Sequence, residues 1–185
     1  MRLLVFMFGV CASAAADTIV TFDPPQTQIR WTLSAMLHTV HGTFQLKSGR
    51  IRFDPVTGKA SGQLVVSAAS GESGNESRDK HMHQSILESA RFADIVFTPD
   101  QVIGKMEPEG KSTIQVHGNF HLHGAGHEFT LPVEVEMRNG QAAAVAHFSI
   151  PYLRWGLKNP STFVLRVGDS VDVEIQASAK VTNGL

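Results

Sequence analysis

The chain has 185 residues, of which 42% are hydrophobic and 18% charged, and its 16 basic side chains nearly balance its 17 acidic ones. A chain of this length fits one ordinary domain, which can bury a core without disulfide or metal cross-links. Its near-neutral charge and lack of a Lys or Arg run argue against a nucleic-acid-binding protein, which needs a basic patch.

The first 16 residues have the proportions of a secretory signal peptide. One positive charge is followed by the apolar run Leu3 to Cys11, and residues 12–16 supply small side chains before a cleavage site at Asp17. The run is shorter than the ~20 apolar residues that a membrane-spanning helix needs. A lipoprotein anchored at Cys11 is the alternative, but Val10 is larger than the small residue that normally precedes a lipidated Cys. We therefore expect a periplasmic or secreted protein without an integral membrane segment, whose single domain covers residues 17–185.

Alternation of apolar and polar residues dominates the rest of the chain. It is clearest in the runs 28–35, 44–53, 64–68, 114–122, 129–137 and 171–181. Such alternation buries one face of a strand and leaves the other in water, which is typical of antiparallel sheets. Ser48-Gly49 permits a bulge within the second run, and Asn139-Gly140 is the strongest hairpin signal. Eight or more strands without an internal repeat predict a closed barrel or a sandwich.

One segment departs from this pattern. Residues 75–90 contain no Pro or Gly, and Met82 and Ile86 have helical spacing. Asn75 and Ser77 are candidate N-caps, because their side chains can accept hydrogen bonds from the first free backbone N–H groups. The segment predicts one short helix in an otherwise all-β chain.

The histidines suggest a metal site as one hypothesis. His117, His121, His123 and His127 lie close together in the sequence, and His121 and His123 would be about 6.6–6.8 Å apart on one strand face. Solvated histidines on the outer face of the sheet are the alternative, since closed metal sites usually have four ligands. His81 and His83 would point about 200° apart on a helix and should not chelate one ion.

Motifs of enzymes are missing from the sequence. It contains no Gly-x-Ser-x-Gly, no nucleotide-binding glycine fingerprint and no Cys in the expected mature chain. We therefore expect a protein that is not an enzyme and uses no cofactor. The polar cluster Arg78-Asp79-Lys80-His81 is either a solvated first helical turn or a site for the polar head of a ligand at the mouth of a barrel.

The order of several segments resembles the YceI-like family of exported, lipocalin-like, polyisoprenoid-binding proteins. The segments are His38 to Phe44, Ser73 to His81, Ala90 to Phe97, Gly118 to Gly124, Phe129 to Val133 and Gly168-Asp169. The resemblance covers residues 17–182 and implies an eight-stranded antiparallel barrel with one short helix and a long apolar chain in its lumen. The stretch that follows the helix in typical members is shortened here to Arg91 to Ile95.

The predicted ligand-binding site has an apolar and a polar part. The residues expected to face the lumen are Trp31, Leu33, Phe44, Leu64, Phe97, Phe120, Phe129 and Phe148. They suit an isoprenoid tail, although the same side chains could instead fill the barrel. By resemblance, Arg78, Asp79 and His81 are expected near the polar head. The expected function is storage or transport of a polyisoprenoid or similar long-chain lipid, with a histidine metal-binding module as the alternative; the ligand's identity and the formation of a homodimer are left open.

Overall fold

The computed structural model describes residues 16–36, 38–161 and 166–183. Its strands are β1 (Thr18–Phe22), β2 (Gln28–Ser34), β3 (Thr39–Phe53), β4 (Ala60–Glu72), β5 (Asp94–Ile103), β6 (Gly110–Leu122), β7 (Ala125–Arg138), β8 (Gln141–Ile150) and β9 (Val171–Asn183). Its helical segments are η1 (Pro24–Gln26), α1 (Glu76–His81) and η2 (Met82–Ile86). The predicted signal peptide lies, except for Ala16, outside the described residues.

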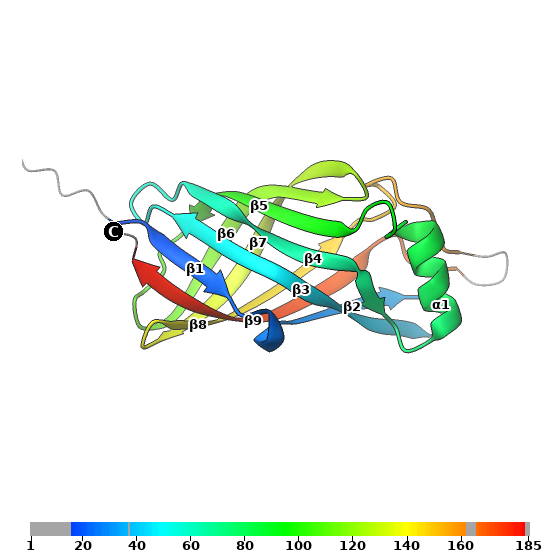
Figure 1. The fold of residues 1–185 in the computed structure, drawn as a ribbon, viewed down its shortest axis with the longest axis horizontal. Coiled ribbons are helices and arrows are strands. Elements are labelled where there is room, and N and C mark those ends of the chain that lie inside the picture. Colours follow the sequence, from blue (N-terminus) through cyan, green and yellow to red (C-terminus); the bar gives the residue numbers. More distant parts are fainter. Residues whose placement is uncertain (1–15, 37, 162–165, 184–185) are drawn as a thin grey trace, which may run out of the picture.

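The strands form one closed antiparallel sheet (Figure 1). Their order is β1-β3-β2-β9-β8-β7-β6-β5-β4, and β3 also pairs with β4, which closes the ring. Both β1 and β2 pair with β3 on one side and β9 on the other, so they share one position in the ring. The break between them is η1, where Pro24 and Pro25 cannot donate ladder hydrogen bonds. The ring therefore has eight positions, which confirms the eight-stranded lipocalin-like barrel and rules out the sandwich.

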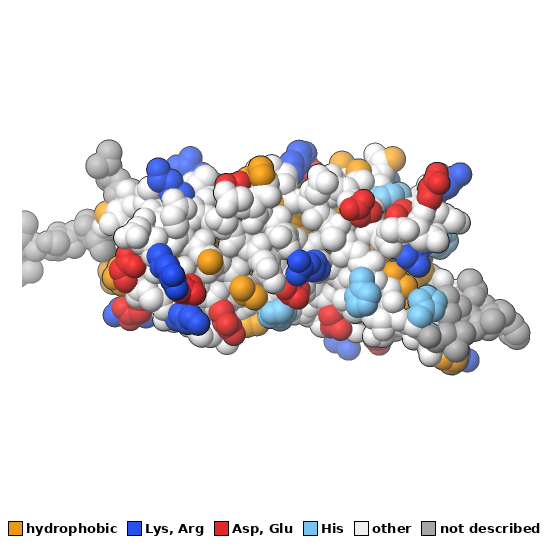
Figure 2. All heavy atoms as spheres, turned by 90° about the horizontal axis from the view of Figure 1, so that it is seen from below, with side chains coloured by type: hydrophobic (Ala, Val, Ile, Leu, Met, Phe, Trp, Pro, Cys, Tyr) orange, Lys and Arg blue, Asp and Glu red, His pale blue; other side chains and the backbone are white. Residues whose placement is uncertain are grey.

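Alternation places apolar side chains inside the barrel, as predicted. On β6, Ile114, Val116 and Phe120 are buried, whereas the intervening Gln115 and His121 are exposed. The face shown in Figure 2 carries acidic and basic side chains side by side with only small apolar patches. Among the described residues each strand pairs with a neighbour on both sides, so the wall separates the apolar interior from water.

The bulge expected at Ser48-Gly49 divides β3 into two parts. The pairing with β4 shifts register between Leu46 and Ser48. Before the shift the buried positions are even-numbered, as at Val40 and Leu46, and after it they are odd-numbered, as at Ile51 and Phe53. Because of the bulge, apolar side chains face the inside of the barrel along both halves of this long strand.

The helical segment covers the end of the barrel opposite the C-terminus (Figure 1). Strand β4 pairs with β5 only over Leu64–Ser67, and the chain between them carries α1 and η2. Asn75 caps α1, its Oδ1 accepting a hydrogen bond from the Arg78 backbone N–H at 3.0 Å. The helix ends before the predicted residue 90, because one π-helical turn follows α1 and Glu88 then adopts a positive φ of 45°.

Two further sequence expectations concern a turn and membrane insertion. Asn139 and Gly140 form the two-residue turn between β7 and β8 and have φ values of 51° and 73°, which confirms the hairpin. Within the described part of the chain, no helix has the length and apolar character to cross a membrane.

Candidate functional site

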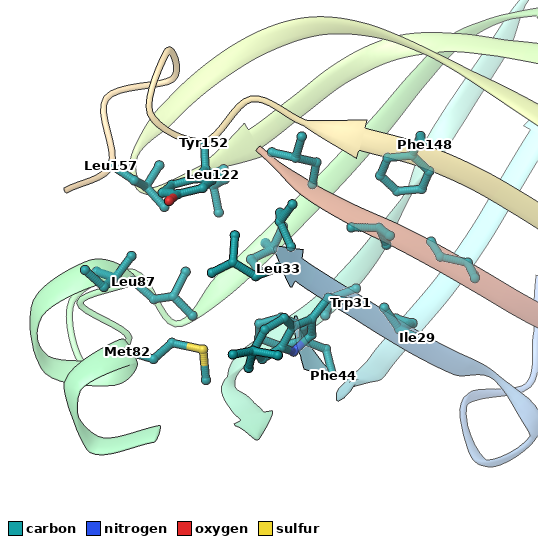
Figure 3. A pocket seen from close by; sticks show the side chains of 18 of the residues that line it. Ile29, Trp31, Leu33, Phe44, Met82, Leu87, Leu122, Phe148, Tyr152 and Leu157 are labelled. Carbon is teal, nitrogen blue, oxygen red and sulfur yellow. The ribbon is translucent and has the colours of Figure 1, made fainter. Parts of the chain in front are cut away.

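A cavity of about 530 Å³ lies inside the barrel and is lined almost entirely by apolar side chains. Seven of the eight residues predicted to face the lumen line it, namely Trp31, Leu33, Phe44, Leu64, Phe97, Phe120 and Phe148. Figure 3 shows Trp31, Phe44 and Phe148 from three strands pointing into this space, with Met82 and Leu87 of the helical segment facing them. The cavity can therefore accept an apolar group, which would leave the buried Nε1 of Trp31 without a hydrogen-bond partner, as it is in the structure.

The cavity occupies the half of the barrel next to the helical segment. The other half is packed, because the inward residues there contact one another and not the cavity. Phe53, Ile114 and Met137, for example, are exposed to only 6%, 6% and 3%. The cavity therefore lies next to the end of the barrel that α1 and η2 cover.

Phe129 is the predicted lumen residue that does not line the cavity. It is turned inward but packs among aromatic rings, with ring centroids 6.0 Å from Phe120, 5.6 Å from Phe148 and 5.7 Å from Trp155. Trp155 also stacks on His127 at 4.2 Å with an interplanar angle of 2°. Phe129 therefore contacts the lining residues Phe120 and Phe148 but does not line the cavity itself. Strand alternation predicts only that a side chain faces inward, and it cannot distinguish these two positions.

Most of the polar lining residues lie at the mouth of the cavity, namely His38 from the β2–β3 connection and Asn75, Ser77, Arg78 and His81 from the helical segment. Two further polar groups of the lining, the hydroxyls of Thr27 and Tyr152, donate to backbone carbonyl oxygens. Two of the three residues predicted near a ligand head, Arg78 and His81, thus lie at the mouth. Among the described residues, no Asp or Glu lines the cavity.

Asp79, the third predicted head-group residue, faces away from the cavity and organises the start of the helix. Its carboxylate accepts hydrogen bonds from the Ser73 backbone N–H at 2.9 Å and from the Ser73 hydroxyl. Burial opposes ionisation of Asp79, but these hydrogen bonds outweigh it and hold the pKa of the carboxyl below its usual value. Arg78 donates from Nε to the same Ser73 hydroxyl at 2.7 Å. Asp79 therefore positions Arg78 through Ser73.

The helical segment adds apolar lining that the prediction of the lumen omitted. Met82, Ile86 and Leu87 line the cavity, and so do Tyr152 and Leu157 from the β8–β9 connection. The helical spacing of Met82 and Ile86 was a usable signal, because an apolar stripe on a helix must cover something apolar. Tyr152 and Leu157 lie in an irregular loop and carried no such signal.

His83 fixes the helical segment to the end of β4. Its Nε2 donates to the Gly71 carbonyl oxygen at 2.8 Å, and because a carbonyl only accepts, Nε2 carries the proton. Its Nδ1 lies 3.1 Å from the hydroxyl of Ser89, which is buried. His83 is thus a structural residue of the segment that covers the cavity.

The four histidines of the metal hypothesis are not brought together. His117 lies on the outer face with Nδ1 2.6 Å from Asp100, whereas His127 is turned inward against Trp155. His123 lies at the β6–β7 turn with a positive φ of 52° and packs on Phe92 at 4.4 Å. No group of three or more His, Cys, Asp or Glu side chains in the described residues is arranged to hold a metal ion. The hypothesis placed all four histidines near one strand face, but the turn at residues 123–124 separates them.

Comparison with known families decides the family of this barrel. The model of the YceI-like domain matches residues 20–179, which include every lumen and mouth residue named above. The chain belongs to the YceI-like family. The resemblance stated from the ordered segments is thereby confirmed. A search of curated proteins gave no match.

Solved structures share the YceI-like fold at low sequence identity. Burkholderia cenocepacia BcnA is similar with a TM-score of 0.70 and 15% identity, over 86% of this chain and 99% of that one. A polyisoprenoid-binding domain from Saccharophagus degradans, implicated in plant cell wall breakdown, has a TM-score of 0.63 and 14% identity, over 88% and 98%. The YceI protein of Campylobacter jejuni has a TM-score of 0.58 and 14% identity, over 97% and 92%. At these identities the likeness concerns the barrel itself.

Proposed function

We propose that this YceI-like protein is an exported carrier that holds the apolar chain of a polyisoprenoid or similar amphiphile in its barrel. The observation that supports this most is the apolar cavity inside the barrel, whose Arg and His lining residues, Arg78, His38 and His81, lie at the end covered by the helical segment. An amphiphile has the matching distribution, with one apolar tail and one polar head. Burial of the tail would drive binding at about 25 cal/mol per Å² of apolar surface, before the costs of association.

The polar head would lie at the mouth, next to Arg78 and His81. Both side chains line the cavity where it opens, and Asp79 and Ser73 hold Arg78 in place. Binding and release would need no chemical step, since no nucleophile or cofactor motif accompanies the cavity. We therefore propose storage or transport and not catalysis.

The proposed location is the periplasm or the cell exterior. It rests on the charge, apolar run and small residues of positions 1–16, which are typical of a signal peptide cleaved before Asp17. The polyisoprenoid-binding domain of Saccharophagus degradans, with the same barrel, supports the class of ligand. A metal-binding function through the histidines is not proposed, because they lie apart.

Native mass spectrometry of the protein purified from the exported fraction tests the carrier function. The expected result is a chain that begins at Asp17 with a stoichiometric excess mass, which passes into the organic phase as a lipid. A polypeptide mass without excess, unchanged after incubation with prenyl lipids, would contradict the proposal. The mass of the mature chain tests the cleavage site in the same experiment.

A further inference from the structure

The lining of the cavity ends part-way along the strands, at a layer of packed side chains that forms its floor. The innermost lining residues are Phe22, Leu46, Leu64, Leu131 and Ala177, on five different strands. Beyond this level the inward side chains of the described residues are buried in one hydrophobic cluster. The inward residues next to it include Ile51, Val102, Val116, Val135 and Ala179, which are exposed to 8%, 7%, 8%, 6% and 1%.

The depth of the cavity follows from strand geometry. On β9 the lining residues run from Val171 to Ala177, which is six residue steps or about 20 Å along a strand. Strands in barrels are tilted by about 35–45° from the barrel axis, so the depth along the axis is about 15 Å. On β2 and the residues that flank it the lining runs from Thr27 to Ala35, which is eight residue steps or about 27 Å along the strand and about 20 Å along the axis. The usable length is therefore about 15–20 Å.

This length limits the chain that can be enclosed. With C–C bonds of about 1.5 Å, an extended chain advances roughly 1.3 Å per bond, so about 12–16 main-chain carbons fit. We propose that the floor restricts the enclosed tail to this length, which corresponds to three or four isoprene units or to an unbranched acyl chain of about 16 carbons. The inference rests on the proposed carrier function, because it names the tail that the same cavity would hold.

A longer chain would gain nothing from its extra carbons. The packed half of the barrel prevents the tail from passing through, so the excess must remain outside the mouth in water. Folding the chain back on itself would need twice the width, and Trp31, Phe44 and Phe148 project into the cavity from three strands (Figure 3). The affinity should therefore stop rising once the tail reaches the floor.

A series of saturated fatty acids from 8 to 24 carbons tests the limit, using the delipidated mature protein and displacement of a fluorescent fatty acid. Affinity is expected to rise about three- to four-fold per methylene, from the transfer of each CH₂ out of water, and then to level off near 16 carbons. A rise that continues to 24 carbons would overturn the limit while leaving the carrier function intact. If no chain of any length bound, both proposals would fall.

We call the chain length at which affinity stops rising the break. Two variants at the floor should move this break in opposite directions. Phe22→Ala removes a ring from the floor and is expected to shift the break to longer chains by several carbons. Ala177→Leu adds bulk at the same level and is expected to shift it to shorter chains. Thr21→Ala, on the exposed side of β1, is the matched control and should leave the break unchanged. If both floor variants bind with the break of the unmodified protein, these residues do not set the length.

Discussion

Glu88 and Lys158, 70 residues apart in the chain, are joined by a hydrogen bond of 3.0 Å from Nζ to Oε1. The other carboxylate oxygen of Glu88 lies 3.5 Å from Nε2 of His123. One carboxylate thereby connects the end of the helical segment to the β8–β9 connection and to the β6–β7 turn. The last two flank the aromatic cluster behind the cavity wall, so Glu88 links three segments at the end where a ligand would enter.

Removal of the Glu88 charge is expected to speed ligand release. In Glu88→Gln the hydrogen bond from Lys158 loses its charge assistance, so the helical segment opens more often. A release rate raised a few-fold, with little change in melting temperature, is expected from stopped-flow displacement. Glu76→Gln, an exposed charge on α1, is the matched control. Equal rates in the two variants would show that Glu88 does not hold the segment.

The ion pair of Glu88 and Lys158 also predicts that the rate of ligand release depends on pH. The hydrogen bond from Lys158 is the main cause that lowers the pKa of Glu88, helped by the nearby charges and opposed by burial. A carboxyl with a lowered folded pKa stabilises the folded state above its unfolded pKa of about 4.3 and loses this effect as pH falls through the folded value. The part of ligand retention that depends on Glu88 should therefore be lost, and release should accelerate, below about pH 4. Glu88→Gln should lack this acceleration.

A charge in the cavity is expected to abolish lipid uptake. Phe44→Asp places a carboxylate among apolar lining residues, where an apolar tail would have to desolvate it. Gln45→Asp, the next residue and exposed on the outer face, is the matched control. Lipid uptake, measured by native mass spectrometry, should be lost in the first variant and kept in the second, with circular dichroism confirming that both are folded. Unchanged uptake in Phe44→Asp would contradict the assignment of the cavity as the tail site.

Gly42 is expected to be intolerant of any side chain. It lies opposite Trp31 in the β2–β3 pairing, and a Cβ there would be 2.3 Å from Trp31 Cε2 and 2.2 Å from the Glu72 carbonyl oxygen. Gly42→Ala must displace the backbone or the indole, and overpacking of this kind costs about 1–3 kcal/mol. Chemical denaturation should show this loss, and Thr43→Ala should stay close to the unmodified protein. A Gly42→Ala protein of unchanged stability would show that the indole moves freely.

His117 and Asp100 form a hydrogen-bonded pair on the outer face, and NMR can follow the titration of His117 in this pair. The hydrogen bond to Asp100 is the main cause that raises the pKa of His117, and burial opposes it. A His with a raised folded pKa contributes stability below its unfolded pKa of about 6.5 and loses the contribution as pH rises through the folded value. In Asp100→Asn, NMR titration should show the His117 pKa moving down toward 6.5. Lipid uptake should not change, because the pair faces away from the cavity; a change in uptake would contradict this placement.

Much of the site could be predicted because strand alternation is a local pattern. Leu33, Phe44 and Phe120 were recognised as inward-facing from their neighbours alone, and all three line the cavity. Phe129 has the same pattern but lies behind the lining, because Trp155 from a distant loop packs against it. The sequence near Phe129 does not indicate that this loop packs there. The same applies to Tyr152 and Leu157, whose positions depend on an irregular connection.

The polar residues divide in a similar way. Arg78, Asp79 and His81 were grouped because they are adjacent, yet only Arg78 and His81 line the mouth. Asp79 turns toward Ser73, since a carboxylate near a helix start is satisfied by backbone and hydroxyl donors. The four histidines were grouped by proximity in sequence, and a two-residue turn was enough to send them to different faces.

Local patterns predicted the wall of this protein: antiparallel strands, a bulge near Ser48, a short helix with Asn75 or Ser77 as its cap, and the inward side of the alternating runs. These features follow from residues that are neighbours in the chain. No such local pattern indicates that one half of the barrel is packed and the other hollow, which the three-dimensional structure shows. Whether inward side chains meet depends on which residues from different strands share a level of the barrel, and that depends on the register between strands and not on the pattern along any one of them.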